Sequence, residues 1–257
     1  MTKIKYLLIL LFALACGFTG YKITQSYFTD TEKVLGNSIQ VGTWGITPSP
    51  ETPTPTNTLT PTLTLTPTPS NLADHIVISE VQIQGTNADQ DFVELYNPTS
   101  FTVDLSGWRL RKRNSSGNED SLAVIPDGKS IPAHGFFLWA NNQDNFDTSI
   151  GADISNGNNL SENNSVAIFT KSGNTPIDQV AWGSANGQFV EGTACQLNFS
   201  SGGSIERKAY STSDATSMMS GSDVTKGNAY DSENNSEDFI LRTISNPQNT
   251  SSPIEIP

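Results

Sequence analysis

The sequence predicts an all-β domain built as a β-sandwich. Short runs of β-branched and aromatic residues alternate with clusters of Gly, Asn, Asp and Ser, which are typical of turns. No stretch of residues 72–257 has the spacing of an amphipathic helix. In GWRLRKR, Trp108 and Leu110 fall on one face and three arginines on the other, as in a strand that packs on one side and meets water on the other. Many short strands of this kind favour two stacked sheets.

The composition argues against several functional classes. The chain has 257 residues and a formal net charge of −12, so general nucleic-acid binding, which depends on neutralising phosphates, is not expected. Cys16 and Cys195 are too few for a cysteine-rich zinc site or a disulfide scaffold. His75 and His134 leave little material for a catalytic triad. We therefore expect a protein that is not an enzyme and that has no cofactor other than a candidate Ca²⁺ site considered below.

Residues 1–26 have the pattern of a secretory signal peptide. Lys3 and Lys5 precede an apolar run over residues 6–18, which is shorter than the ~18–20 residues that span a bilayer. Small residues suit a cut before Tyr27, and the alternative is a lipobox that ends at Cys16. Both routes predict an extracellular or cell-surface protein. Membrane attachment is then expected only through an uncleaved leader or a lipidated cysteine.

Residues 27–46 carry YFTDTE, then GNS and GTW. This segment resembles the mature start of camelysin and of the biofilm-matrix fibre proteins of Gram-positive bacteria, which implies export through a dedicated signal peptidase. The alternative is an N-terminal stub with a chance similarity.

Residues 47–71 are expected to form a disordered Thr/Pro-rich stalk. Thr-Pro and Thr-Leu pairs repeat through this linker, and proline fixes φ and supplies no backbone donor, so neither a helix nor a central strand forms. The apolar content is too low to offset the entropy of ordering. A polyproline-like extension at ~3.1 Å per residue makes a semi-rigid spacer of roughly 75 Å. The remaining residues, 72–257, are long enough for one domain with its own core.

Nine β-like runs in this domain are expected to be strands, and three long stretches lack strand character. The runs are His75–Ile83, Phe92–Tyr96, Gly107–Arg113, Leu122–Ile125, Gly135–Ala140, Ser165–Thr170, Ile177–Trp182, Ser204–Lys208 and Phe239–Leu241. The stretches without strand character are 141–164, 183–203 and 211–238. Loops of this length are uncommon unless they are functional or mobile.

Six short motifs occur in a fixed order along the domain. They are IVISEV at 76–81, DFVELYNP at 91–98, VDLSGWRL at 103–110, IPAHG at 131–135, SIERK at 204–208 and NPQN at 246–249. This order resembles the lamin tail domain as it occurs in secreted bacterial proteins. The resemblance implies an immunoglobulin-like β-sandwich and no catalysis. The long Asn/Ser-rich loops and His134 depart from the family pattern, which affects loop ligands rather than the fold.

Four residues are expected to have structural roles. Gly107 allows a tight turn into a strand, and we expect the indole of Trp108 to be buried there, so that its truncation costs about 3–5 kcal/mol. Asn97-Pro98 is a turn signal, and Glu94 and Asn97 are expected to bond turn backbone. A role in ligand binding is the alternative for these two.

The segment 231–238, DSENNSED, is dense in oxygen ligands that suit a hard cation such as Ca²⁺. The candidate ligands are Asp231, Glu233, Asn235 and Asp238. Ser236 stands where an EF-hand loop requires Gly, and Arg242 stands where it requires the bidentate Glu, so this is not an EF-hand. A solvated acidic loop is the alternative.

A basic cluster lies on the alternating strand. Arg109, Arg111 and Arg113, with Lys112 between them, form a candidate polyanion-binding site. A solvent-facing strand without a ligand is the alternative, and the acidic net charge opposes polyanion binding in general.

These observations favour a non-catalytic, secreted or cell-surface interaction or adhesion module on a Thr/Pro stalk. Its partners are expected to be an envelope or matrix polysaccharide or a protein. One alternative is a secreted polysaccharide hydrolase that uses Glu80, Asp91 and Glu94, because paired carboxylates cleave glycosides. Another is a matrix subunit that self-assembles through the mature N-terminus near Tyr27.

Overall fold

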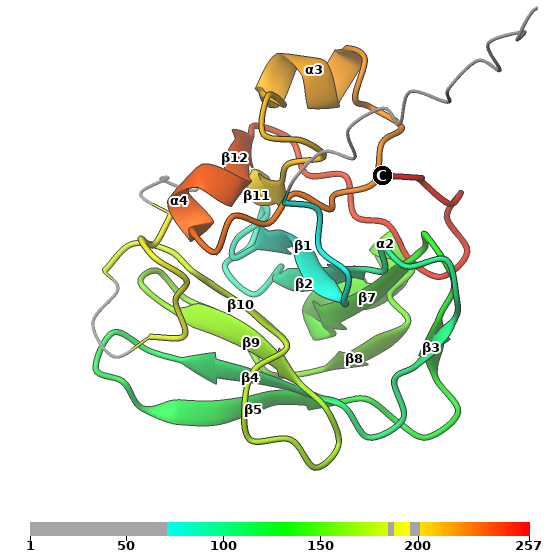
Figure 1. Ribbon diagram of the computed structural model, residues 1–257. Coiled ribbons are helices and arrows are strands. Elements are labelled where there is room, and N and C mark those ends of the chain that lie inside the picture. The colour runs from blue at the N-terminus through cyan, green and yellow to red at the C-terminus, as the bar shows by residue number, and fades with distance from the viewer. Residues whose placement is uncertain (1–70, 185–187, 196–200) are drawn as a thin grey trace, which may run out of the picture. The chain divides into compact units, whose positions relative to one another are not determined.

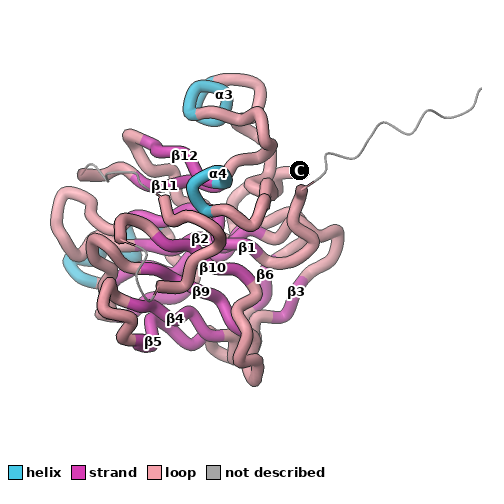
Figure 2. The backbone as a smooth tube through the Cα atoms, turned by 60° about the vertical axis from the view of Figure 1, so that its left-hand side comes forward, coloured by secondary structure: helices cyan, strands magenta, loops and turns pink. Residues whose placement is uncertain are grey.

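Two β-sheets pack face to face and enclose the core (Figures 1 and 2). The computed structural model describes residues 71–184, 188–195 and 201–257. The predicted signal peptide, the segment 27–46 and the stalk up to residue 70 lie outside the described residues. All of the described residues belong to one compact domain of the chain.

The larger sheet has six strands in the order β12-β11-β1-β2-β7-β8. Its strands are β1 (Val77–Gln82), β2 (Phe92–Tyr96), β7 (Phe136–Asn141), β8 (Ile154–Asn156), β11 (Ser204–Arg207) and β12 (Phe239–Arg242). Every pair is antiparallel except β7 and β8, which are parallel. Motifs far apart in sequence therefore become neighbours, since β11 and β2 lie on either side of β1.

The smaller sheet has four antiparallel strands in the order β10-β9-β4-β5. They are β4 (Arg109–Arg113), β5 (Glu119–Val124), β9 (Ser165–Phe169) and β10 (Asp178–Ala181). A two-stranded ladder of β3 (Val103–Asp104) and β6 (Ser130–Ile131) completes the described strands.

The core lies between the two sheets and draws on both. Val93 and Leu95 of β2 point inward, as do Leu110 of β4 and Ile168 of β9, and all four are fully buried. Burial of each such side chain contributes about 1.5–3 kcal/mol. This arrangement confirms the predicted all-β class and an immunoglobulin-like β-sandwich.

A β-bulge in β1 explains why its apolar residues change phase. The register with β2 shifts between Ile78 and Glu80, so Ser79 is the extra residue. Ile76 and Ile78 face the core before the bulge, and Val81 faces it after the bulge. A bulge inserts one residue and so restores the inward alternation, which leaves Glu80 on the outer face.

Short helices lie in two of the three stretches without predicted strands, 141–164 and 211–238, and the first of these also contains β8. They are the 3₁₀ turn η1 (Gln143–Asn145), α2 (Phe146–Ile150), α3 (Ala215–Ser220) and α4 (Asn235–Asp238). Asp214 caps α3 by accepting from the Ser217 amide at 2.8 Å, an arrangement that satisfies an otherwise unpaired donor. In the described part of the chain, no helix has both the length and the apolar character to cross a membrane.

The C-terminal segment, residues 246–255, covers the outer face of the larger sheet. It runs along the side of β1 and β2 that faces away from the smaller sheet (Figure 1). The amides of Asn246 and Gln248 donate to side chains of that face, and the Tyr96 hydroxyl donates to the carbonyl of Glu255. The side chains of β1 and β2 on this outer face are therefore buried beneath the C-terminal segment.

Candidate functional site: an arginine pocket on the smaller sheet

The three arginines of β4 project from the outer face of the smaller sheet. β4 is paired on both sides, with β5 and β9, so its alternation is enforced by two ladders. Leu110 enters the core, whereas Arg109, Arg111 and Arg113 line a pocket of about 440 Å³. We call this hollow the arginine pocket. Its other lining residues are Glu119, Phe169, Gly173, Asn174, Pro176, Gln179, Gln188, Phe189 and Val190.

Two phenylalanines hold the guanidinium groups in place. The Cζ of Arg113 lies 4.0 Å from the ring centroid of Phe189, and that of Arg109 lies 5.6 Å from the ring centroid of Phe169. The two rings contact each other edge to face with 5.7 Å between centroids. The Phe189 amide donates to Ser165 Oγ at 2.9 Å, which anchors this segment to β9. Cation–π contacts of this kind restrict the arginines to defined positions.

Glu119 is the acidic residue that lines the pocket, and it forms ion pairs with two of the three arginines. Its Oε1 lies 2.6 Å from Arg111 Nε, and its Oε2 accepts from Arg113 Nη2 at 2.7 Å and Nε at 3.0 Å. Arg109 instead donates to the backbone carbonyls of Thr170 and Gly173. Among the described residues, no carboxylate forms an ion pair with Arg109. The pocket thus carries three guanidinium groups and one carboxylate.

A row of carboxylates lies on the outer face of the larger sheet, under the C-terminal segment. Glu80 of β1 is in register with Glu94 of β2 on one side and with Glu206 of β11 on the other. All three are buried. Arg242 of β12 forms an ion pair with Glu206 at 2.7 Å. We call Glu80, Glu94 and Glu206 the carboxylate row.

Burial is the main cause of the altered pKa values in the carboxylate row. It raises the pKa of Glu80 to about 7, with a further contribution from the charge of Glu206. It also raises the pKa of Glu94 well above its usual value, and the neighbouring Glu80 adds to this. Hydroxyl donors oppose the shift, since Ser79 donates to Glu94 at 2.5 Å and Ser204 donates to Glu80.

The carboxylates proposed for a hydrolase are separated by the sheet itself. Asp91 directly precedes β2, three residues before Glu94, and residues an odd number apart on a strand face opposite sides. Asp91 accepts from the Leu160 amide at 2.7 Å, and burial raises its pKa to about 7. Glu94 instead accepts from Gln248 on the outer face. The expected constellation of Glu80, Asp91 and Glu94 is therefore corrected: Asp91 does not join the other two.

A buried arginine organises the acidic groups at one end of the sandwich. Arg207 of β11 is fully buried, and its Nη2 donates to both oxygens of Asp178 of β10, at 2.8 and 2.9 Å. This pair links the two sheets. Asp231 lies 3.4 Å and Asp238 lies 3.8 Å from Arg207 Nη1. Desolvation of these charges is offset only because each is paired.

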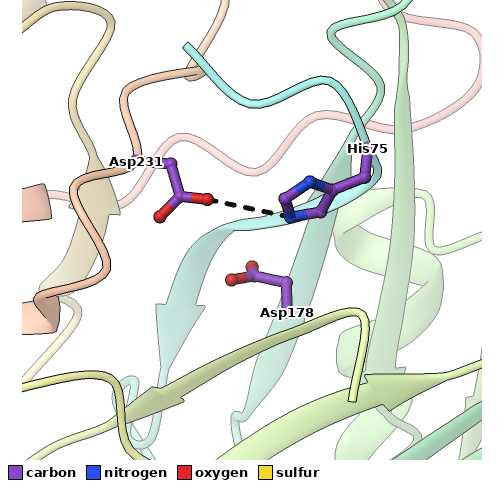
Figure 3. A group of neighbouring side chains, drawn as sticks. All are labelled: His75, Asp178 and Asp231. Atoms are coloured by element: carbon purple, nitrogen blue, oxygen red, sulfur yellow. Dashed lines mark ion pairs between the residues drawn. The ribbon is translucent and has the colours of Figure 1, made fainter. Parts of the chain in front are cut away.

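His75, Asp178 and Asp231 come together (Figure 3), and both aspartates form ion pairs with Arg207. His75 Nε2 lies 3.7 Å from an oxygen of Asp231, and the three ligand atoms lie within 4.8 Å of one another. Asp178 already accepts from Arg207 and from the Ile78 amide at 2.5 Å. A metal cation here would face the guanidinium at close range, so the group is an ion-pair cluster.

The four candidate Ca²⁺ ligands have different surroundings, and only Asp231 and Asp238 belong to one group of neighbouring carboxylates. Asn235 is buried and bonds the edge of β10: its Nδ2 donates to Gln179 O at 3.0 Å, and its Oδ1 accepts from the Ala181 amide at 3.1 Å. Glu233 is exposed, and Asp238 accepts from Ser232. In this structure Asn235 caps the edge of β10 and Asp231 and Asp238 lie beside Arg207; Ca²⁺ binding by Asp231, Glu233, Asn235 and Asp238 stays a prediction.

Asp231 and Asp238 instead group with Glu191. Their carboxylate oxygens lie within 4.8 Å of one another. Burial and the charge of Asp178 raise the pKa of Glu191 to about 9, so this carboxyl holds its proton at neutral pH. A protonated Glu191 adds no negative charge to the neighbouring carboxylates of Asp178 and Asp231, so the repulsion among these acidic groups is smaller.

The four residues expected to be structural are placed as follows. Gly107 has φ of +74°, a left-handed conformation that favours glycine. Asn97 donates to the carbonyls of Phe101 and Pro132 and accepts from Thr99. Glu94 bonds the backbone of the distant Gln248 rather than that of its own turn.

Trp108 differs from the expectation that it is buried. It is only partly buried and packs against the margin of the core, because it lies in the turn before β4 rather than within the strand. In the described part of the chain, the fully buried indoles are Trp139 of β7 and Trp182 after β10. The sequence carried a signal for Trp139, since it occurs in the apolar run of β7, FFLWAN.

Comparison with known proteins bears on the same stretch of chain. Residues 69–184 match the family model described as Lamin Tail Domain. No curated protein has a significant match to the chain. The matched residues include β4, β5 and β9, which carry the arginines, Glu119 and Phe169. Phe189 and the C-terminal segment lie beyond the match.

Proposed function

Residues 69–184 of this chain are a lamin tail domain, and from this premise we propose that the protein is a non-catalytic interaction module that binds an anionic partner in the arginine pocket. The observation that carries the proposal is the clustering of three guanidinium groups against one carboxylate in a pocket of about 440 Å³. Arginine suits this role because its planar fork binds carboxylates and phosphates through two hydrogen bonds.

The proposal places the module outside the cell. The leader of residues 1–26 supports export, and the Thr/Pro-rich residues 47–71 support display on a stalk. An envelope or matrix polymer, or a protein with an acidic surface, is then the partner. N-terminal sequencing and mass measurement of the mature chain test the export route: a start at Tyr27 indicates cleavage, and a lipid-modified Cys16 indicates anchoring.

A hydrolase is not proposed. A glycoside hydrolase generally needs two carboxyl groups that face the same substrate. Glu80 and Glu94 are covered by the C-terminal segment, and Asp91 faces the other way.

Binding of anionic and neutral polymers to the full chain tests the proposal. We expect the anionic polymer to bind, with an affinity that falls as salt rises, because exposed charges are screened. Arg109→Gln should weaken binding. Lys112→Gln removes the same charge three residues further along β4 and from the opposite face, where Lys112 bonds the Asn159 carbonyl.

Equal losses in these two variants would mean that only net charge matters, and would contradict a site in the pocket. Binding of the neutral polymer with the same affinity would contradict the anionic nature of the partner.

A further inference from the structure

Glu119 occupies part of the arginine pocket in the way a ligand carboxylate would. Its two oxygens are shared between two arginines, Oε1 with Arg111 and Oε2 with Arg113. The arginines are two residues apart on one strand, so their side chains leave the backbone roughly 7 Å apart. A single planar carboxylate spans them. The position between Arg111 and Arg113 therefore fits a carboxylate group.

The pair is held loosely enough to be exchanged. About a third of the Arg111 and Arg113 side chains and about a quarter of the Glu119 side chain are exposed, at 35 % and 26 %. Ion pairs of this exposure contribute ~0.2–1 kcal/mol. Glu119 also sits near the end of β5, an edge strand of the smaller sheet. An incoming carboxylate therefore displaces Glu119 without breaking the fold.

Arg109 supplies a second position for an anion. It bonds neutral carbonyls and faces no ion-paired carboxylate among residues 71–184, 188–195 and 201–257. Along β4 it lies roughly 7–10 Å from the position that Glu119 fills. A ligand that reaches both positions must carry at least two anionic groups along one chain.

Resting on the proposed function, we infer that the partner is a polymer with repeated carboxylates, an acidic polysaccharide of the uronate type, and that Glu119 is its built-in competitor. The polymer places one carboxylate at Arg109 and a second between Arg111 and Arg113. Glu119 then turns outward to solvent. Glu119 sets the affinity by competing for the same two guanidinium groups.

Calorimetric titration of the full chain with a galacturonate hexamer tests this inference, with Glu119→Gln as the informative variant. Removal of the competing carboxylate should raise the affinity by about threefold to tenfold. Asp120→Asn is the matched control, since Asp120 is the next residue of β5, pairs in register with Lys112 and does not line the arginine pocket. It should change the affinity by less than about twofold. The galacturonate monomer should bind more weakly than the hexamer.

The outcomes separate the two proposals. If Arg109→Gln weakens binding of the hexamer but Glu119→Gln and Asp120→Asn have equal effects, Glu119 is no competitor and the inference fails, while the proposed function stands. Tighter binding of polyphosphate or single-stranded DNA than of the hexamer would overturn the uronate assignment. If neither the wild type nor Glu119→Gln binds any anionic polymer, both proposals fail. Binding by Glu119→Gln alone would support the inference.

Discussion

The outer faces of the two sheets carry similar chemistry in opposite settings. On the smaller sheet, the pair of Arg113 and Glu119 is open to water, with 35 % and 26 % of the side chains exposed. On the larger sheet, the pair of Arg242 and Glu206 lies beneath other chain segments, with 10 % and 11 % exposed. The open charges can exchange partners with a ligand. The covered charges are committed to the fold, because an unpaired charge there would be desolvated.

The C-terminal segment is what makes the two faces differ. It donates backbone amides to Glu80 and Glu94 and so closes the outer face of the larger sheet. No described segment covers the arginine pocket in this way. A charged strand face is therefore open to a ligand only where the rest of the chain leaves it uncovered.

The largest expected effect comes from breaking the covered ion pair. Arg242→Ala leaves Glu206 without its guanidinium partner in the carboxylate row, and loss of one partner of a buried pair costs about 3–5 kcal/mol. Arg113→Ala, which breaks the open pair, should cost about 1 kcal/mol or less. Urea denaturation of both variants measures the difference. Equal free energies of unfolding would show that the two faces do not differ as described.

The next effect is a dependence of stability on pH. Glu80 has a folded pKa of about 7 against its usual 4.5, so the folded state binds its proton more tightly than the unfolded state does. Its contribution to stability is therefore fully present below about pH 4.5 and is lost as the pH rises to 7. Glu94 and Asp91 shift in the same direction. We expect the free energy of unfolding to fall between pH 5 and pH 7, measured by urea denaturation at each pH.

Glu80→Gln should flatten this fall, because the amide does not titrate. Asp104→Asn is the control: hydrogen bonds from Ser106 lower the pKa of Asp104, so that group contributes stability that is lost only as the pH falls below its usual range. A slope between pH 5 and pH 7 that is the same in Glu80→Gln as in the wild type would show that the carboxylate row does not control it.

A smaller effect than that of Arg242→Ala is expected at Trp108, in the turn that leads into β4. Trp108 is partly buried, so Trp108→Ala should cost about 1–2 kcal/mol, less than a fully buried indole. Trp139→Ala, at a fully buried site, should cost about 3–5 kcal/mol. Thermal unfolding ranks the two. A greater loss at Trp108 would restore the expectation that this indole anchors the core.

The strands and the arginine face were predictable, because both depend on local alternation. All nine expected strands occur, with bounds displaced by a few residues, and GWRLRKR places its arginines outward as expected. The very short strands β3 and β6 and the parallel strand β8 were missed. Two or three residues carry too little pattern, and β8 lies in a stretch rich in Asn and Ser.

The sequence by itself determined that this chain is a β-sandwich with a row of arginines on one solvent-facing strand, since a period of two residues assigns each side chain to a face. Only the tertiary structure decided what each face meets. Glu119 reaches the arginines across a strand pair, Phe189 supports them from a distant loop, and Arg207 pairs with Asp231 and Asp238, two of the acidic residues that the sequence suggested for Ca²⁺. The contacts of Phe189 and Arg207 join residues far apart along the chain, and the contact of Glu119 depends on the register of the β4–β5 hairpin; the alternation within one strand carries no information about either.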